Sequence, residues 1–137
     1  MFLIDTDTCS ALIAGHDSIL QNAGNFERGN WAISSVTAME LSYGAHLSRI
    51  SKPKRLLVNA FLEDAPVIAF DRLAGLAAGK VRAVLQEAGK PTGPYDLLIA
   101  GHALSQNLIL VTGNGKHFKH VQGLMIDDWF VRSPRGA

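Results

Sequence analysis

The chain has 137 residues, with 13 Lys and Arg against 12 Asp and Glu, a single cysteine and 47% hydrophobic residues. This size and composition predict one globular domain whose core is large enough to fold without covalent cross-links. The single cysteine excludes an intrachain disulfide and a zinc site of the CxxC type. No apolar run approaches the ~20 residues of a membrane span, and the N-terminus lacks the basic segment of a secretion signal. We therefore expect a cytoplasmic protein that does not enter a membrane.

Short apolar runs alternate with longer helical patterns along the chain. Strands are predicted at Phe2–Asp5, Trp31–Ser35, Pro66–Phe70, Leu108–Thr112 and Leu124–Asp127. Helices are predicted at about 8–28 with a break near Gly15, and at 37–50, 53–64, 71–88 and 94–106. This alternation is typical of an α/β domain, here a three-layer α/β/α fold with a central, mostly parallel five-stranded sheet. The domain occupies residues 1–131, and we expect 132–137 to form a flexible tail.

Polar residues follow the first and the fourth predicted strands. Asp5 closes the strand FLID, and in open parallel sheets ligands bind just beyond the carboxyl ends of the strands. Asp5 could equally be the N-cap of the following helix, and its position alone favours neither interpretation. Thr112 ends the fourth predicted strand and Asn114 follows it at the same edge, although Asn114-Gly115 is first of all a turn signal.

Glu40 is a carboxylate that the predicted helix over 37–50 directs at or near the core. The stripe beside it, which includes Met39 and Tyr43, is apolar. An unpaired buried carboxylate is costly, so its presence there indicates a function. The alternative is a boundary residue that completes a capping box with Thr37.

Asp96 begins an unusually apolar helix with the sequence GPYDLLIAGHAL. A helix that is apolar nearly all round is central and buried. Pro94 fits its first turn, and the helix dipole stabilises an acid at this end. An exposed acid would satisfy the dipole equally well, but the apolar neighbours of Asp96 predict burial.

The acids Asp5, Glu40 and Asp96 come from three separate elements that the topology could bring to one edge of the sheet. Three carboxylates packed together cannot all stay ionised without a counter-charge. A hard divalent cation supplies that charge, and ligation by oxygen alone selects Mg²⁺ or Mn²⁺. Such ions activate water and stabilise phosphoryl displacement. The pattern therefore predicts metal-dependent hydrolysis of a phosphodiester.

Five segments carry a resemblance to a known family. They are LIDTDTCSALI at 3–13, ISSVTAMELSYGA at 33–45, GKPTGPYDLLIAGHAL at 89–104, LVTGNGKHF at 110–118 and GLMIDDW at 123–129. In this order they resemble the PIN-domain ribonucleases and, among these, the VapC-type toxins of bacterial toxin–antitoxin pairs. The segments span nearly the whole chain, and the ELSYG and GPYDLLIAGHAL pieces together are specific.

The resemblance implies a Mg²⁺- or Mn²⁺-dependent endoribonuclease in which Asp5, Glu40 and Asp96 are the catalytic acids and metal ligands. Asn114, with Thr112, would orient a ligand or a water molecule. Structured RNA, often tRNA, is the implied substrate, and its cleavage would inhibit translation and growth. The implied partners are a second copy in a homodimer and a cognate VapB-like antitoxin, whose C-terminal segment covers the active-site groove.

Three positions depart from the family pattern. Asp7 stands where the family more often has Asn, so it either tunes the site or caps the helix. Asn114 stands where many relatives carry a fourth acid. His117 precedes Phe118 at a position that often carries an acid; we place it beside the site or on the surface rather than among the catalytic residues.

Other functions fit parts of the sequence. The segment Asp5-Thr6-Asp7-Thr8 matches the opening motif of haloacid dehalogenase-like phosphatases, with Asp5 as nucleophile. That interpretation leaves Glu40 and Asp96 unexplained. A receiver-like signalling domain would need a phosphoacceptor where only Asp71 is available, and a helix cap explains that residue better. A metal-free ribonuclease using histidines as acid and base is the third possibility, but His102 lies in the apolar helix and is expected to pack within the fold.

Two further features are interpreted as structural. Tyr43 is assigned to the core rather than to a surface that stacks on bases, and the basic cluster over 52–55 is assigned to a solvated helix start that could also contact RNA or antitoxin. Outside the three catalytic acids and Asp7, eight acids remain against 13 bases. The rest of the molecule is therefore basic, which suits a phosphate backbone drawn to an acidic, cation-binding edge.

Overall fold

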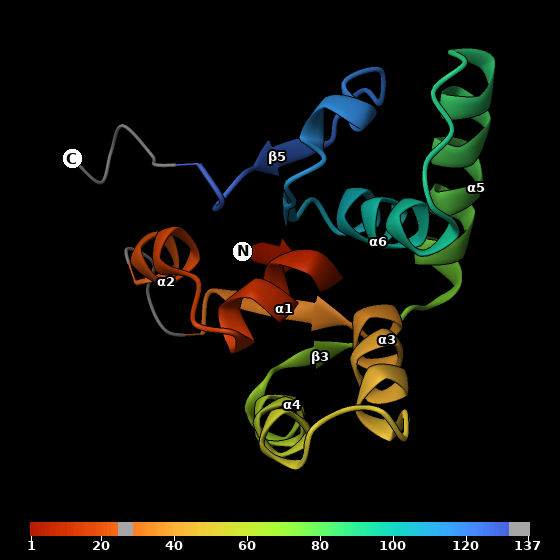
Figure 1. Cartoon of the computed structure of the whole chain (residues 1–137). Coiled ribbons are helices and arrows are strands. Elements are labelled where there is room, and N and C mark those ends of the chain that lie inside the picture. The colour runs from red at the N-terminus through yellow and green to blue at the C-terminus, as the bar shows by residue number, and fades with distance from the viewer. Residues whose placement is uncertain (25–28, 132–137) are drawn as a thin grey trace.

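Five parallel strands form one sheet in the order β3-β2-β1-β4-β5 in a computed structural model, which describes residues 1–24 and 29–131 (Figure 1). The strands are β1 (Phe2–Ile4), β2 (Trp31–Ser34), β3 (Val67–Ile68), β4 (Ile109–Val111) and β5 (Met125–Asp127). The helices are α1 (Thr6–Ile13), α2 (Asp17–Ala23), α3 (Ser35–His46), α4 (Lys52–Asp64), α5 (Arg72–Glu87) and α6 (Pro94–Ser105), with a 3₁₀ helix η1 (Gly115–Phe118).

The predicted elements are confirmed with shifts of a few residues at their ends. The helical pattern that starts at residue 8 is two helices, and the predicted break falls at Gly15, whose φ of +79° favours glycine. The helix η1 was not predicted, because the Asn-Gly turn signal masks a single 3₁₀ turn. The predicted end of the first helical pattern at 25–28 and the predicted tail at 132–137 lie outside the described residues.

Alternate residues of the central strand enter two separate cores. Phe2 and Ile4 pack in the core beneath α1, α2, α3 and α4, whereas Leu3 packs in the core beneath α5 and α6. A strand whose side chains alternate between two buried faces must be apolar at every position. The three-layer α/β/α fold with a parallel sheet is therefore confirmed, and here every strand pair is parallel.

The order of the strands indicates where a ligand would bind. The chain moves outward from β1 to β2 and β3 and then returns to the other side of β1 as β4. The point at which the strand order reverses therefore lies between β1 and β4, and in open parallel sheets ligands bind at such a point. Asp5 follows β1 and Thr112 follows β4, and the Asp5 amide donates to the Val111 carbonyl at 3.0 Å.

The buried face of α3 differs from the prediction. The buried residues are Thr37, Leu41 and Ala45, while Met39 is 44% exposed and Tyr43 is 64% exposed. Tyr43 lies about 200° around the helix from Leu41, on the opposite face. The assignment of Tyr43 to the core is therefore wrong, because a stripe of apolar residues chosen from the sequence fell on the solvent side.

Side chains that cap helices fix the helix starts. The Val36 amide donates to the Ser34 hydroxyl at 3.1 Å, so α3 begins before Thr37 and the capping box with Glu40 does not form. The Ala74 amide donates to Asp71 Oδ1 at 3.0 Å, which confirms Asp71 as a cap. Within the described ranges, no helix is both long and apolar enough to cross a bilayer.

Candidate active site

Asp5 is a buried carboxylate with two structural partners. It is only 4% exposed, and its Oδ1 accepts from the Thr8 amide at 2.9 Å, so it caps α1. Burial raises the pKa of Asp5, hydrogen bonds from Thr112 and Thr8 lower it, and the charge of Asp7 raises it further. Asp5 is therefore an N-cap, as one interpretation of the sequence predicted, and it lies at the carboxyl edge of the sheet that the other interpretation requires.

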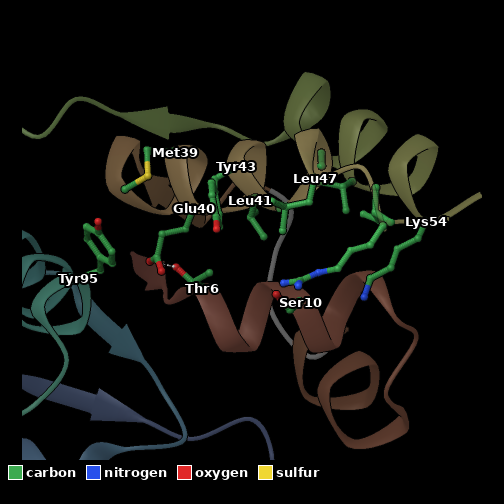
Figure 2. A pocket seen from close by; sticks show the side chains of 14 residues that line it. Thr6, Ser10, Met39, Glu40, Leu41, Tyr43, Leu47, Lys54 and Tyr95 are labelled. Atoms are coloured by element: carbon green, nitrogen blue, oxygen red, sulfur yellow. Dashed lines mark hydrogen bonds between the residues drawn. The ribbon is translucent and has the colours of Figure 1, made fainter. Parts of the chain in front are cut away.

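Glu40 is half-buried and is held by α1. Its Oε1 accepts from the Thr6 hydroxyl at 2.6 Å, and the same hydroxyl lies 3.2 Å from the Thr37 hydroxyl (Figure 2). A short charge-assisted hydrogen bond of this kind fixes the direction of a carboxylate. Sequence reasoning missed Thr6, although its place between Asp5 and Asp7 was a usable signal.

Asp96 is half-buried in the first turn of α6, where the sequence placed it. Burial raises its pKa, as do the charges of Asp5, Asp7 and Glu40 in that order, while the charge of His117 lowers it. Carboxylates repel one another electrostatically, so this effect reports that acids from α1, α3 and α6 lie close together. The three predicted acids are therefore brought to one edge of the sheet.

Thr112 links Asp5 to the loop after β4. Its hydroxyl donates to Asp5, which lowers the pKa of that carboxyl, and accepts from the Asn114 amide at 3.1 Å. The side chain of Asn114 makes no capping hydrogen bond at η1, whereas the backbone carbonyl of Asn114 accepts from the His117 amide at 2.9 Å. Thr112 thus contacts Asp5, and Asn114 lies two residues further along the same loop.

Asp7 and His117 act on the acids through charges of opposite sign. Asp7 is exposed in the first turn of α1, and its charge raises the pKa of both Asp5 and Asp96. His117 is half-buried in η1, and it is the group whose charge lowers the pKa of Asp96. This effect agrees with the placement of His117 beside the site rather than among the catalytic residues.

A buried hydrogen bond joins the two helices that carry Glu40 and Asp96. His102 of α6 is fully buried, and its Nδ1 lies 2.8 Å from the hydroxyl of Ser34, the N-cap of α3. Its Nε2 has no partner within the described part of the chain, and its ring meets Phe70 edge to face at 5.5 Å. Burial lowers the pKa of His102, so the ring is neutral and belongs to the core, as expected.

The donor set at this edge fits a hard cation. It consists of carboxylate oxygens from three elements, and burial together with the charges of the neighbouring acids raises the pKa of Asp96. Among residues 1–24 and 29–131, no three Asp, Glu, His or Cys side chains are already gathered in a metal-binding arrangement.

A family model covers most of the chain. The PIN domain model matches residues 2–124. The chain is 38% identical over 128 residues to a protein of Shigella flexneri described as a tRNA(fMet)-specific endonuclease VapC, and the match covers 93% of this chain and 97% of that protein.

Two solved structures have the same fold. One is DNA-bound VapBC from Salmonella typhimurium, with a TM-score of 0.82 and 37% identity over 93% of this chain and 97% of that one. The other is VapBC2 from Rickettsia felis bound to a promoter DNA fragment, with a TM-score of 0.82 and 32% identity over 93% of this chain and 98% of that one.

Proposed function

Because this chain belongs to the VapC-type toxins of the PIN-domain family, we propose that it is an endoribonuclease that uses Mg²⁺ or Mn²⁺ held by Asp5, Glu40 and Asp96. Nuclease activity and a toxin role are properties of the family. The observation that supports the metal proposal is the nearness of the acids at the point where the strand order reverses, where burial and then the charges of three neighbouring carboxylates raise the pKa of Asp96.

Each acid has a distinct part in the proposed reaction. Asp5 and Asp96 are the best placed to hold the cation directly, because both are carboxylates with raised pKa values at the sheet edge. When bound, the ion lowers the pKa of a water molecule and offsets negative charge on the cleaved phosphate. Glu40, oriented by the Thr6 hydroxyl, either ligates the ion or accepts the proton of the attacking water.

The residues after β4 support the acids. Thr112 holds Asp5 through its hydroxyl, and Asn114 carries a side-chain amide that is free of a capping role. We propose that Asn114 orients a ligand or a water molecule. Asp7, which is exposed, adds negative charge beside the ion, because its charge acts on Asp5 and Asp96.

The substrate and partners follow from the relatives as proposals. A relative that is 38% identical is described as specific for tRNA(fMet), and we propose that this chain also cleaves a tRNA and thereby stops translation and growth. VapBC structures resemble this chain over 93% of its length, which supports neutralisation by a cognate VapB-like antitoxin. A homodimer and a location in the cytoplasm, where tRNA is used, complete the proposal.

The test is cleavage of initiator tRNA by purified protein. We expect cleavage with Mg²⁺ or Mn²⁺ and none with EDTA, and product ends of 5′-phosphate and 3′-hydroxyl. Asp96→Asn should lose most activity while keeping its circular dichroism spectrum, and Asp64→Asn, an exposed acid at the end of α4, should match the wild type. Cleavage that resists EDTA and leaves 2′,3′-cyclic phosphates would contradict the proposal, as would full activity in Asp96→Asn.

A further inference from the structure

The helix η1 after β4 has three faces, because a 3₁₀ helix has three residues per turn and side chains three residues apart lie above one another. Gly115 and Phe118 form its inner face. A Cβ at Gly115 would lie 2.8 Å from Ile126 Cγ2, and Phe118 is buried in the core beneath α5 and α6. Packing of this face against β5 and the core fixes how η1 is turned.

A second face of η1 holds two lysines side by side. Lys116 lies within η1, and Lys119 is its C-cap, with a φ of −63° and a ψ of −19° that continue the 3₁₀ geometry. Both side chains are exposed, and within the described ranges neither lysine is paired with a carboxylate. Two cations on one face of η1 are therefore open to an anionic ligand.

The helix η1 lies beside the candidate active site. Its third face holds His117, which is close enough to Asp96 for its charge to lower the pKa of that carboxyl. At the start of η1, the Asn114 amide donates to the hydroxyl of Thr112, and the same hydroxyl donates to Asp5. The lysine face of η1 therefore borders the edge of the sheet at which the acids lie.

The helices around the acids supply no long basic side chain. Asp5 caps α1, while Glu40 and Asp96 lie in α3 and α6, and none of these three helices contains a Lys or an Arg. An RNA strand has a phosphate at every nucleotide, and the acids repel each phosphate that passes near them. The phosphates on either side of the cleaved one therefore need positive charge from another element, and η1 has it.

We propose that Lys116 and Lys119 bind the RNA backbone phosphates next to the one that is cleaved. The proposal rests on the proposed ribonuclease function and adds the surface over which the substrate passes. Because the proposed reaction already brings one phosphate to the acids, neighbouring phosphates of the same strand reach η1 without a further partner. Lysine binds phosphate as a point charge and reads no sequence, so this face contributes affinity and position rather than the choice of RNA.

The experiment measures RNA binding apart from cleavage. In an Asp96→Asn background, binding of fluorescein-labelled initiator tRNA is followed by fluorescence anisotropy at several salt concentrations. Lys116→Ala/Lys119→Ala should lower the slope of log Kd against log salt by about 1.4 to 1.8, at about 0.7 to 0.9 per lost phosphate contact. If both proteins bind alike at about 1 M salt, this corresponds to roughly 25- to 60-fold weaker binding at about 0.1 M. Lys116→Arg/Lys119→Arg keeps both charges and should bind like the parent.

A matched control removes the same charge elsewhere. Arg72→Ala/Lys80→Ala takes two positive charges from exposed positions on α5 and should leave the slope and the affinity unchanged. Unchanged tRNA binding in Lys116→Ala/Lys119→Ala would overturn the proposal. An equal loss in the α5 pair would also overturn it, because the effect would then report net charge alone.

Two further measurements separate the remaining outcomes. If a fluorescein-labelled decaglutamate peptide binds as tightly as the tRNA, and the Lys116→Ala/Lys119→Ala pair weakens both alike, the lysines have no preference for RNA and the proposal fails. In otherwise wild-type protein, the same pair should raise the KM for tRNA cleavage and leave kcat unchanged. Absence of cleavage by the wild type would refute the proposed function itself, whereas cleavage with an unchanged KM in the pair would refute only the role of the lysines.

Discussion

Gly101 is the position where the packing of α5 against α6 has least room. A Cβ at Gly101 would lie 2.4 Å from Ala78 Cα, 2.5 Å from Ala78 N and 2.7 Å from Ala78 Cβ. Two of these atoms belong to the backbone of α5, so no rotation of a side chain relieves the contact. Gly101→Ala therefore forces the two helices apart.

The size of this effect follows from the contact distances. Ordinary van der Waals contact begins at 3.4 Å, so α5 and α6 must separate by about 1 Å. The core between these helices includes Val81, Leu85 and Ile99, and a gap of that size forfeits roughly a quarter to a half of each contact across it. We expect a loss of about 3 kcal/mol in the free energy of unfolding, at the upper end of overpacking effects.

Thermal unfolding followed by circular dichroism tests this estimate. With an unfolding entropy of about 2.1 cal/mol/K per residue, a loss of about 3 kcal/mol lowers the Tm of a 137-residue chain by roughly 10 °C. Gly79→Ala is the control, because a Cβ on this α5 residue meets nothing within 4 Å and should stabilise the helix by about 0.5–1 kcal/mol. A Tm of Gly101→Ala within 2 °C of the wild type would refute the reasoning.

Three further predictions concern the site and its support. Asp96→Asn should raise the Tm at pH 7 in metal-free buffer, because the raised pKa of Asp96 makes the wild type lose stability as the pH rises above 3.8. Below that pH the carboxyl is protonated in the folded and the unfolded chain, so the gain in Tm should vanish. Mg²⁺ should raise the Tm of the wild type but not that of Asp96→Asn. The pKa of His102 is lowered by burial, so at this residue the unfolded chain binds more protons than the folded chain, and the Tm should fall as the pH drops below 6.5. His102→Asn keeps a polar group for Ser34 and should lose this pH dependence of the Tm. Thr6→Val should cut the cleavage rate by about 10–100-fold by releasing Glu40, while Thr6→Ser, which retains the hydroxyl, should stay near the wild type in the same assay.

Local signals predicted the layout of the fold. Strands that are apolar at every position and alternate with helices predict a parallel sheet covered on both faces. The first strand is an example, because Leu3 packs in one core and its neighbours Phe2 and Ile4 pack in the other. Carboxyl ends of parallel strands share one edge, so the neighbourhood of Asp5 and Thr112 was predictable as well. These features depend on chain order and hydrophobicity, which a sequence carries directly.

The orientation of single side chains was not predictable to the same degree. Apolar residues lie on more than one face of α3, and only one face is buried. The buried face holds Leu41, so Met39 and Tyr43 are left on the exposed side. The Ser34–His102 hydrogen bond joins residues 68 apart in sequence. Such contacts depend on the tertiary arrangement, which periodicity within one helix does not specify.

Asp5 shows how stability and chemistry share one residue. Its Oδ1 accepts from the Thr8 amide and caps α1, a contribution of about 0.5–2 kcal/mol, and the same carboxyl is raised in pKa by burial. Removing it by Asp5→Ala therefore loses a cap and a buried charge together, and the two effects on folding oppose each other. Asp96 makes no cap, because Gly93 is the N-cap of its helix. Loss of cleavage in Asp5→Ala reports on α1 as well as on the reaction, whereas loss of cleavage in a folded Asp96→Asn reports on the reaction.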